Sequence, residues 1–270
     1  MAMTYHANCH CGAFKLSFAT PAPIDAAVLC DCSACSKNGY VFVMDPENVV
    51  FTKGVESALG SYSFGRKVHE HKFCKTCGTS MFLKEIRGDE VHMFISLRAV
   101  QTIDVSALAN KRVFDGSKTP PAYVTPTPPS PPAADSSSPD AEIYSGSCHC
   151  GAITYAFRAP KISSATECNC SICTRLGALW TYIPTASLAV KLTEETAVTE
   201  YMFGTKQAAH TFCSTCGVDV YTRFAGPESS VLSPVMRALN VRTLNGVDIS
   251  AWEVKKADGK AYPPEYVVPE

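Results

Sequence analysis

Cys30-Asp31-Cys32-Ser33-Ala34-Cys35 places three thiols within six residues, and the pattern returns as Cys168-Asn169-Cys170-Ser171-Ile172-Cys173. In each half of the chain a Cys-x-Cys-Gly segment precedes this triplet and a Cys-x-x-Cys-Gly segment follows it. The flanking thiols are Cys9, Cys11, Cys74 and Cys77, then Cys148, Cys150, Cys213 and Cys216. This scheme uses all 14 cysteines, seven in each half. The cysteine pattern therefore divides the sequence into two copies of one unit.

The repeat extends beyond the cysteines when the second half is slid back by about 139 positions. His71-Lys72-Phe73-Cys74 matches His210-Thr211-Phe212-Cys213, and Asp115-Gly116 matches Asp258-Gly259. Between the copies lies a stretch rich in proline and serine, which cannot bury a core and predicts an extended, solvated tether. We expect a first domain over residues 1–122, a linker over 123–145 and a second domain over 146–270.

The composition is that of a globular protein without a polyanionic partner. Of 270 residues, 46% are hydrophobic and 18% charged, and the net charge is -1. The sequence contains no basic arm of the kind that predicts nucleic-acid binding. The segment Met1–His6 lacks the cationic and apolar regions of a signal peptide, and no stretch approaches the ~18 apolar residues of a membrane helix. We therefore expect the protein in the cytoplasm or nucleus, with neither a nucleic-acid nor a membrane partner.

The expected reducing compartment and the odd number of thiols in each copy both indicate that the thiols bind metal. Reducing compartments disfavour disulfides, so a dense cysteine pattern there more often marks a metal site. Seven thiols in a copy cannot all pair with one another, whereas a division into four and three uses every one.

Hydrophobic alternation predicts a mainly β fold. Phe14, Leu16 and Phe18 share one face of a strand, and Ile153, Tyr155 and Phe157 repeat the arrangement. Further strands are expected over residues 40–44, 80–83, 91–97, 179–183 and 219–222. Short helices are expected after Cys35 and Cys173 and around residues 105–109. The chain should form two small, mostly antiparallel domains with few short helices, each stabilised by metal.

The flanking thiols have the spacing of closed zinc sites. In Cys-x-x-Cys-Gly two thiolates converge on one ion while the glycine lets the backbone turn with positive φ. Pairing with a distant Cys-x-Cys completes a tetrahedral site. We expect one structural Zn²⁺ on the four flanking thiols of each copy, and its role should be to stabilise the fold.

The triplets differ because three protein ligands leave the fourth tetrahedral position to water or substrate, as in catalytic zinc sites. Zinc on three thiolates carries a net charge near -1 and would keep an incoming thiol deprotonated. Three alternatives remain open: a structural site closed by a histidine, a triplet without metal, and iron–sulfur ligation, although the spacing does not match ferredoxins. The candidate closing residues are His10, His69, His71, His149 and His210.

Taken together, the ordered motifs Cys-His-Cys-Gly, Cys-x-Cys-x-x-Cys and Phe-Cys-x-x-Cys-Gly resemble the glutathione-dependent formaldehyde-activating enzyme and centromere protein V family, here in two tandem copies. The resemblance implies a β-tent fold, a structural four-cysteine zinc, and a second zinc on the triplet where glutathione binds. It also implies carbon–sulfur lyase activity that joins or separates formaldehyde and glutathione as S-(hydroxymethyl)glutathione. Asp31 and Asn169 stand where many enzyme-like members carry histidine. By motif, the active-site metal ligands would be Cys30, Cys32, Cys35, Cys168, Cys170 and Cys173.

Several cations and aromatic residues lie near the triplets or at matched positions. A cation beside a negatively charged metal site would lower a thiol pKa or bind a glutathione carboxylate, the alternative being a solvated surface charge. The candidates for this cofactor-binding role are Lys37, Arg175, Lys67 and Lys206. The pairs Tyr62 with Phe64 and Tyr201 with Phe203 are expected to pack the sheet. His71 and His210 should hydrogen-bond a carbonyl or thiolate rather than act as general bases.

The leading hypothesis is a zinc-dependent carbon–sulfur lyase acting on a glutathione adduct of an aldehyde or another electrophilic carbon. The chain would hold up to four Zn²⁺, with glutathione as co-substrate. A second hypothesis is a glutathione-assisted isomerase or addition–elimination enzyme for a larger unsaturated substrate. A third is a non-catalytic, zinc-stabilised interaction module. The electrophile, the division of labour between the copies and the oligomeric state stay open.

Overall fold

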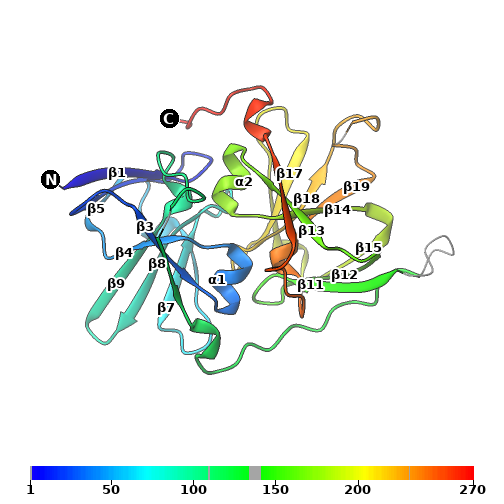
Figure 1. Cartoon of the computed structure of the whole chain (residues 1–270), viewed down its shortest axis with the longest axis horizontal. Helices are drawn as coiled ribbons and strands as arrows, with labels where there is room; N and C mark the ends of the chain where they lie inside the picture. The colour runs from blue at the N-terminus through cyan, green and yellow to red at the C-terminus, as the bar shows by residue number, and fades with distance from the viewer. Residues whose placement is uncertain (1, 109, 134–140, 231) are drawn as a thin grey trace. The chain divides into compact units, whose positions relative to one another are not determined.

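The computed structural model describes residues 2–108, 110–133, 141–230 and 232–270. Two compact units emerge from its internal contacts (Figure 1). The first contains Met1–Tyr123, Thr174–Gly177 and Val267–Glu270, and the second contains Val124–Cys173 and Ala178–Tyr266. The limits 1–122, 123–145 and 146–270 stay a prediction. Part of the expected linker, Ser136–Pro139, lies outside the described residues.

The first copy forms a three-stranded sheet in the order β1-β2-β5 and a seven-stranded sheet in the order β10-β3-β4-β9-β8-β7-β6. Neighbouring strands run antiparallel except for β10 and β3, which are parallel. The bounds are β1 Met3–Asn8, β2 Lys15–Thr20, β3 Ala26–Cys30, β4 Phe42–Met44, β5 Glu47–Lys53, β6 Gly60–Tyr62, β7 His69–Phe73, β8 Ser80–Arg87, β9 Glu90–Ser96 and β10 Asn110–Phe114.

The second copy repeats this topology strand for strand. Its sheets have the orders β11-β12-β15 and β16-β17-β18-β19-β14-β13-β20, and β13 and β20 are again parallel. The bounds are β11 Glu142–Ser147, β12 Ile153–Ala159, β13 Ser164–Cys168, β14 Trp180–Pro184, β15 Leu188–Leu192, β16 Val198–Tyr201, β17 Ala208–Cys213, β18 Asp219–Phe224, β19 Met236–Asn240 and β20 Glu253–Ala257. The mainly β fold in two similar halves is confirmed.

The predicted alternation places the core. Leu16 and Phe18 on β2 are each 1% exposed, whereas the intervening Lys15 and Ser17 are only half-buried, because successive side chains point to opposite faces. On β12 the alternation is lost: Ile153, Tyr155 and Phe157 are fully buried, and the intervening Thr154 and Ala156 are buried as well. This strand is therefore covered on both faces.

Only two α-helices occur among the described residues, α1 Ser33–Asn38 and α2 Ser171–Leu176, with six residues each. Both begin inside the triplets rather than after Cys35 and Cys173. The helix expected around residues 105–109 is wrong: residues 105–107 form a turn, and Ala109 lies outside the described residues. Neither helix has the length and apolar character needed to cross a membrane.

Short 3-10 helices connect many strands. They are η1 Glu56–Ala58, η2 Leu97–Ala99, η3 Gly116–Lys118, η4 Thr185–Ser187, η5 Glu195–Ala197, η6 Val241–Thr243 and η7 Gly259–Ala261. Two of them, η3 and η7, follow the last strand of each copy and return the chain to the triplet.

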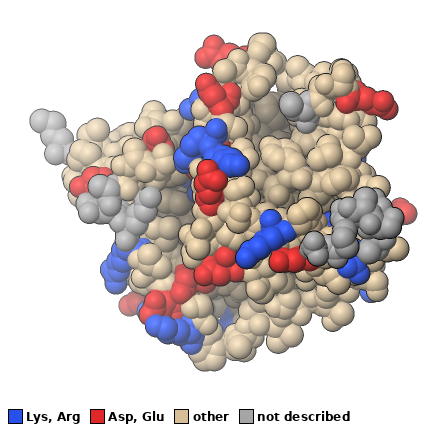
Figure 2. Space-filling view, turned by 45° about the vertical axis from the view of Figure 1, so that its right-hand side comes forward, with Lys and Arg blue, Asp and Glu red and all other residues tan. Residues whose placement is uncertain are grey.

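The face shown in Figure 2 carries both basic and acidic side chains.

Candidate metal centres

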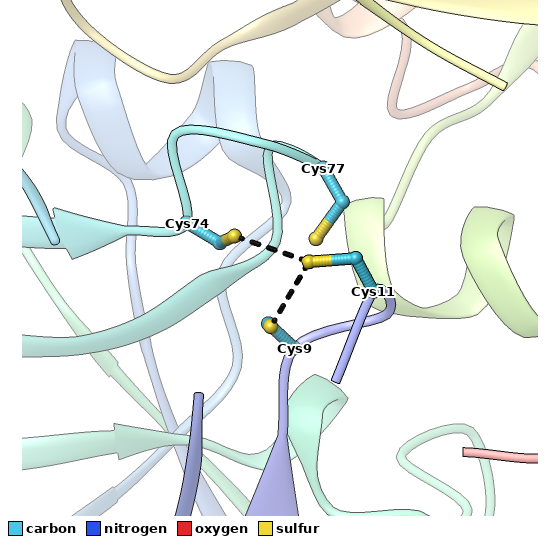
Figure 3. Close-up of side chains that lie close together, drawn as sticks. All are labelled: Cys9, Cys11, Cys74 and Cys77. Carbon is cyan, nitrogen blue, oxygen red and sulfur yellow. Dashed lines mark hydrogen bonds between the residues drawn. The ribbon is translucent and has the colours of Figure 1, made fainter. Parts of the chain in front are cut away.

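Four sulfurs of the first copy converge on one point (Figure 3). Cys9 and Cys11 follow β1, Cys74 follows β7, and Cys77 lies in the turn before β8. The sulfur of Cys11 lies 3.6 Å from that of Cys9 and 3.6 Å from that of Cys74. Four sulfurs around zinc at a Zn–S distance of ~2.3 Å would lie about 3.8 Å apart. The sulfur set therefore fits a tetrahedral zinc ion.

The second copy builds the same group from Cys148, Cys150, Cys213 and Cys216. The sulfur of Cys150 lies 3.6 Å from that of Cys148 and 3.5 Å from that of Cys213. Hydrogen bonds from Cys148 and Cys150 hold the pKa of Cys213 well below its ordinary value, whereas the bonds to Cys150 and Cys213 raise the pKa of Cys148. Four thiols this close share their protons, and a cation is what would let all four ionise.

Backbone N–H groups orient these sulfurs. The amide of Phe14 donates to Cys9 Sγ at 3.2 Å, and the amide of Ile153 donates to Cys148 Sγ at the same distance. Gly78 and Gly217, which close the Cys-x-x-Cys turns, have φ of 72° and 74°. The expected glycine role is confirmed, since side chains rarely adopt this conformation.

Each triplet gathers its three sulfurs at the junction between a strand and a helix. Cys30 ends β3, Cys32 caps the N-terminus of α1, and Cys35 lies within α1. The amide of Cys35 donates to Cys32 Sγ, and the amide of Cys32 donates to Cys30 Sγ, each at 3.5 Å. Because the sulfurs replace an ordinary capping oxygen, the helix start and the thiol cluster form together.

The second triplet repeats this geometry from β13 and α2. Cys168 ends β13, and its sulfur accepts from the amide of Cys170 at 3.5 Å. Cys173, on α2, completes the group. Within the described residues both triplet groups contain three cysteines and no histidine or carboxylate. None of the five candidate closing histidines therefore joins either group.

Thiol crowding sets the proton affinities in each triplet. Hydrogen bonds from Cys32 and Cys35 lower the pKa of Cys30 to about 2, while the bond to Cys30 raises the pKa of Cys32 to about 11. Cys168 and Cys170 show the same split, to about 2 and about 11. Without a cation one thiol of each triplet ionises easily and the others keep their protons. Thiolates are the ligands that zinc prefers, so both triplets fit it.

A loop from the end of each copy packs against its triplet. A Cβ on Gly116 would lie 2.4 Å from Cys30 Sγ, and one on Gly259 would lie 2.4 Å from Cys168 Sγ. Their amides also stabilise the thiolates, since they help to lower the pKa values of Cys30 and Cys168. A side chain is therefore excluded at both glycines by the sulfur itself.

The residue between the first two thiols holds this loop in place. The Asp31 carboxylate accepts from the amide of Ser117 at 2.8 Å and from its hydroxyl at 2.7 Å. Asn169 instead donates to Asp258 at 2.8 Å and accepts from the amide of Lys260 at 2.9 Å. Both side chains fasten the 3-10 turn to the triplet with different hydrogen-bond chemistry, because an amide donates and a carboxylate does not.

Two of the buried histidines, His71 and His210, pack among aromatic rings. His210 is 5% exposed, and burial lowers its pKa to about 4 although the Cys168 charge opposes this shift. The ring is therefore neutral near pH 7. Its Nδ1 lies 3.2 Å from the Thr222 hydroxyl, and its ring packs with those of Trp180 and Phe203. His71 is 2% exposed and packs with the rings of Tyr40, Tyr62 and Phe64.

The predicted cations fall into two classes. Lys37 and Arg175, in the last turns of α1 and α2, are each only 5% exposed. Lys67 and Lys206 are exposed, at matched turns where φ is 56° and 55°. The aromatic pairs beside these turns stack, with ring centroids 6.1 Å apart for Tyr62 and Phe64 and 6.0 Å for Tyr201 and Phe203. A cofactor-binding role for the four cations stays a prediction.

Sequence reasoning missed three features of these centres. Asp115-Gly116 and Asp258-Gly259 were evident only as landmarks of the repeat, although their recurrence outside the cysteine motifs was the available signal. The anchoring role of Asp31 and Asn169 was not foreseen. The hydrogen bond from the indole Nε1–H of Trp180 to Cys173 Sγ, at 3.3 Å, was also missed, because the two residues lie on different elements, β14 and α2.

The sequence also matches a known protein family. The sequence model of the family described as glutathione-dependent formaldehyde-activating enzyme matches residues 4–112 and 143–243. A crystal structure of a Rhodobacter sphaeroides protein is similar, with 32% sequence identity over 42% of this chain and 99% of that chain, and a TM-score of 0.37. Each family segment contains the seven cysteines of one copy.

Proposed function

Because the chain belongs to the glutathione-dependent formaldehyde-activating enzyme family, we propose that it is a zinc-dependent carbon–sulfur lyase. Its substrate would be a glutathione adduct of an aldehyde or of another electrophilic carbon, as in an S-(hydroxymethyl)glutathione synthase. The observation that carries the proposal is the composition of the triplets. In the described residues each gathers three sulfurs and no fourth ligand from a histidine, cysteine or carboxylate side chain. We place this activity in the cytoplasm.

The reaction needs a thiolate and an electrophilic carbon held together. When bound to a triplet, zinc supplies a Lewis acid that favours a thiol in its ionised form. The glutathione sulfur then forms a bond to the carbonyl carbon, the C=O π bond breaks, and the oxygen takes up the proton that the thiol gave up. In the reverse direction the C–S bond breaks and aldehyde and thiol are released.

The chain's own residues have separate tasks in this proposal. The triplet sulfurs hold the metal, and the amides of Gly116 and Gly259 stabilise the first sulfur of each triplet. Asp31 and Asn169 keep the adjoining turns in place. Lys37, Arg175, Lys67 and Lys206 are the candidates to bind the glutathione carboxylates. The four-thiol groups stabilise the fold.

Titration of the zinc-loaded protein with glutathione tests the proposal. Calorimetry should detect binding, and after cobalt substitution the visible absorption should change as a further sulfur joins the metal. Formation of S-(hydroxymethyl)glutathione should depend on Cys32 or Cys170. If glutathione neither binds nor changes the cobalt spectrum, the proposed chemistry is wrong.

One observation favours a larger, apolar electrophile at the first triplet. Cys35 belongs to a buried cluster with Tyr40, Phe42 and Leu83, and Phe94 packs against it. A substrate that reached Cys35 would meet apolar side chains, which suit an unsaturated carbon skeleton better than they suit formaldehyde. A glutathione-assisted isomerase or addition–elimination enzyme is therefore the second candidate. Turnover of conjugated enones without turnover of formaldehyde would favour it.

The non-catalytic interaction module makes an opposite prediction for the triplets. If they only stabilise the fold, replacing Cys32 or Cys170 by Ala should lower the free energy of unfolding as much as replacing Cys74 by Ala is expected to. If they are catalytic, the same variants should lose turnover and remain folded. Far-UV circular dichroism and an activity assay on the same preparations separate the two.

A further inference from the structure

The two triplets share their geometry but differ in the side chains around them. Phe42 on β4 pairs with Val28 on β3, and Trp180 on β14 pairs with Thr166 on β13. Val28 precedes Cys30 by two residues, and Thr166 precedes Cys168 by two. Phe42 and Trp180 therefore occupy the same position relative to their triplets.

Trp180 contacts its triplet in a way that Phe42 cannot. The indole Nε1–H donates a hydrogen bond to Cys173 Sγ at 3.3 Å, and Trp180 is only 3% exposed. A phenylalanine ring has no N–H, so Phe42 packs in the cluster around Cys35 without donating to it. Water is excluded from both positions, so a hydrogen bond here is not weakened by competition with solvent.

A second matched position changes in the same direction. His71 pairs with Leu83, whereas His210 pairs with Thr222, whose hydroxyl lies 3.2 Å from the imidazole Nδ1. The second copy thus has the polar groups of Trp180 and Thr222 at the two positions where the first copy has the apolar side chains of Phe42 and Leu83. Hydrogen bonds around a metal site tune the ligands and the charge at the metal.

A hydrogen bond to a coordinating thiolate withdraws electron density from the sulfur. The metal then receives less charge from that ligand and accepts a further thiolate more readily. We propose that the Trp180–Cys173 hydrogen bond makes the second triplet the stronger thiol-binding centre, while the first triplet binds thiols more weakly. This inference rests on the proposed function, in which the metal-loaded triplets bind glutathione. Trp180 acts here as a positioning residue through Cys173.

Cobalt substitution of the full chain tests this inference one triplet at a time. Cys32→Ala leaves the second triplet intact, Cys170→Ala leaves the first, and the double variant supplies the spectrum of the four-thiol sites. In the Cys32→Ala background, Trp180→Phe should move the sulfur-to-cobalt charge-transfer band to longer wavelength. It should also weaken glutathione binding by about 10-fold, the lower end of the usual effect of such a partner.

Two further variants provide the control and the converse. The chain has two tryptophans, and Trp252→Phe should change neither the band nor the affinity. Phe42→Trp in the Cys170→Ala background should move the band to shorter wavelength and tighten glutathione binding. Trp180→Phe introduces the residue that the first copy already carries at this position. If Trp180→Phe fails to fold, Phe42→Trp tests the inference instead.

The outcomes distinguish failure of this inference from failure of the proposed lyase function. Glutathione binding at both triplets with equal affinity, unchanged by Trp180→Phe, would overturn the inference and leave the lyase proposal standing. A cobalt spectrum that glutathione changes in neither single-triplet background would overturn the lyase proposal itself. Weaker binding in Trp180→Phe, together with the band shift, would support both.

Discussion

Gly116 and Gly259 show how closely single residues are fitted around the triplets. Neither has a positive φ, so the backbone alone would accept another residue. The constraint is the sulfur of Cys30 or Cys168, which a Cβ would approach to 2.4 Å. Real Cβ contacts are not this short, so the loop or the thiol must move.

We predict that Gly116→Ala loses the metal of the first triplet and that Gly259→Ala loses that of the second. Each variant is the control for the other, because each should leave the other triplet and both four-thiol sites loaded. Metal content measured by mass spectrometry on each protein checks this. Full metal content in both variants would show that the loop adjusts without cost.

Asp219 is a buried carboxyl whose two oxygens have no hydrogen-bond partner among the described residues. Desolvation raises its pKa well above the ordinary value. The folded state therefore binds a proton that unfolding releases. By linkage, this group makes the free energy of unfolding fall as the pH rises from about 4 toward the folded-state pKa.

Asp219→Asn should therefore raise the free energy of unfolding near neutral pH, because an amide does not ionise and folding is no longer coupled to proton uptake at this site. The gain should shrink as the pH falls through about 4, because the carboxyl then becomes protonated in the unfolded state as well. Urea denaturation of the zinc-saturated protein across this range measures it. Ser80 occupies the matched position, so Ser80→Asp should have the opposite effect. An equal gain at every pH would contradict the ionisation argument.

At the scale of elements, the two kinds of thiol group differ in how they connect the fold. The four-thiol group of the first copy joins the end of β1, in the three-stranded sheet, to the turn between β7 and β8, in the seven-stranded sheet. The triplet joins only β3 to the adjacent α1. A metal that links distant segments stabilises the folded state more than one that links neighbours.

Cys74→Ala should therefore unfold much of the first copy, whereas Cys32→Ala should leave its β-sheet signal intact. Far-UV circular dichroism and limited proteolysis compare the two variants at equal zinc concentration. Cys213→Ala and Cys170→Ala provide the same comparison in the second copy. Equal loss of structure in all four variants would assign a structural role to the triplets.

Element positions were predictable to different degrees. The β2 and β12 strands follow from alternation, because burial of one face leaves a period of two in the sequence. The starts of α1 and α2 were missed because ordinary capping signals are absent. In α1 the sulfur of Cys32 takes the place of the capping oxygen. The turn at residues 105–107 replaces an expected helix, since so short an apolar run gives no reliable period.

For the whole molecule, the repeat means that each copy carries one four-thiol group and one triplet. We predict four zinc ions per chain after loading, three in either Cys32→Ala or Cys170→Ala, and two in the double variant. Mass spectrometry under non-denaturing conditions counts them. Two ions in the unmodified, zinc-saturated protein would contradict zinc binding at the triplets.

The sequence alone determined the two copies, the mainly β fold and the grouping of the cysteines. Spacing is enough for these, because thiols two or three residues apart at a turn converge on one ion and the repeat shows which pairs belong together. Tertiary structure decided what surrounds the sulfurs. The approach of Gly116, the anchoring by Asp31, the isolation of Asp219 and the hydrogen bond from Trp180 to Cys173 all depend on how separate elements pack against one another. Local sequence spacing does not encode those contacts.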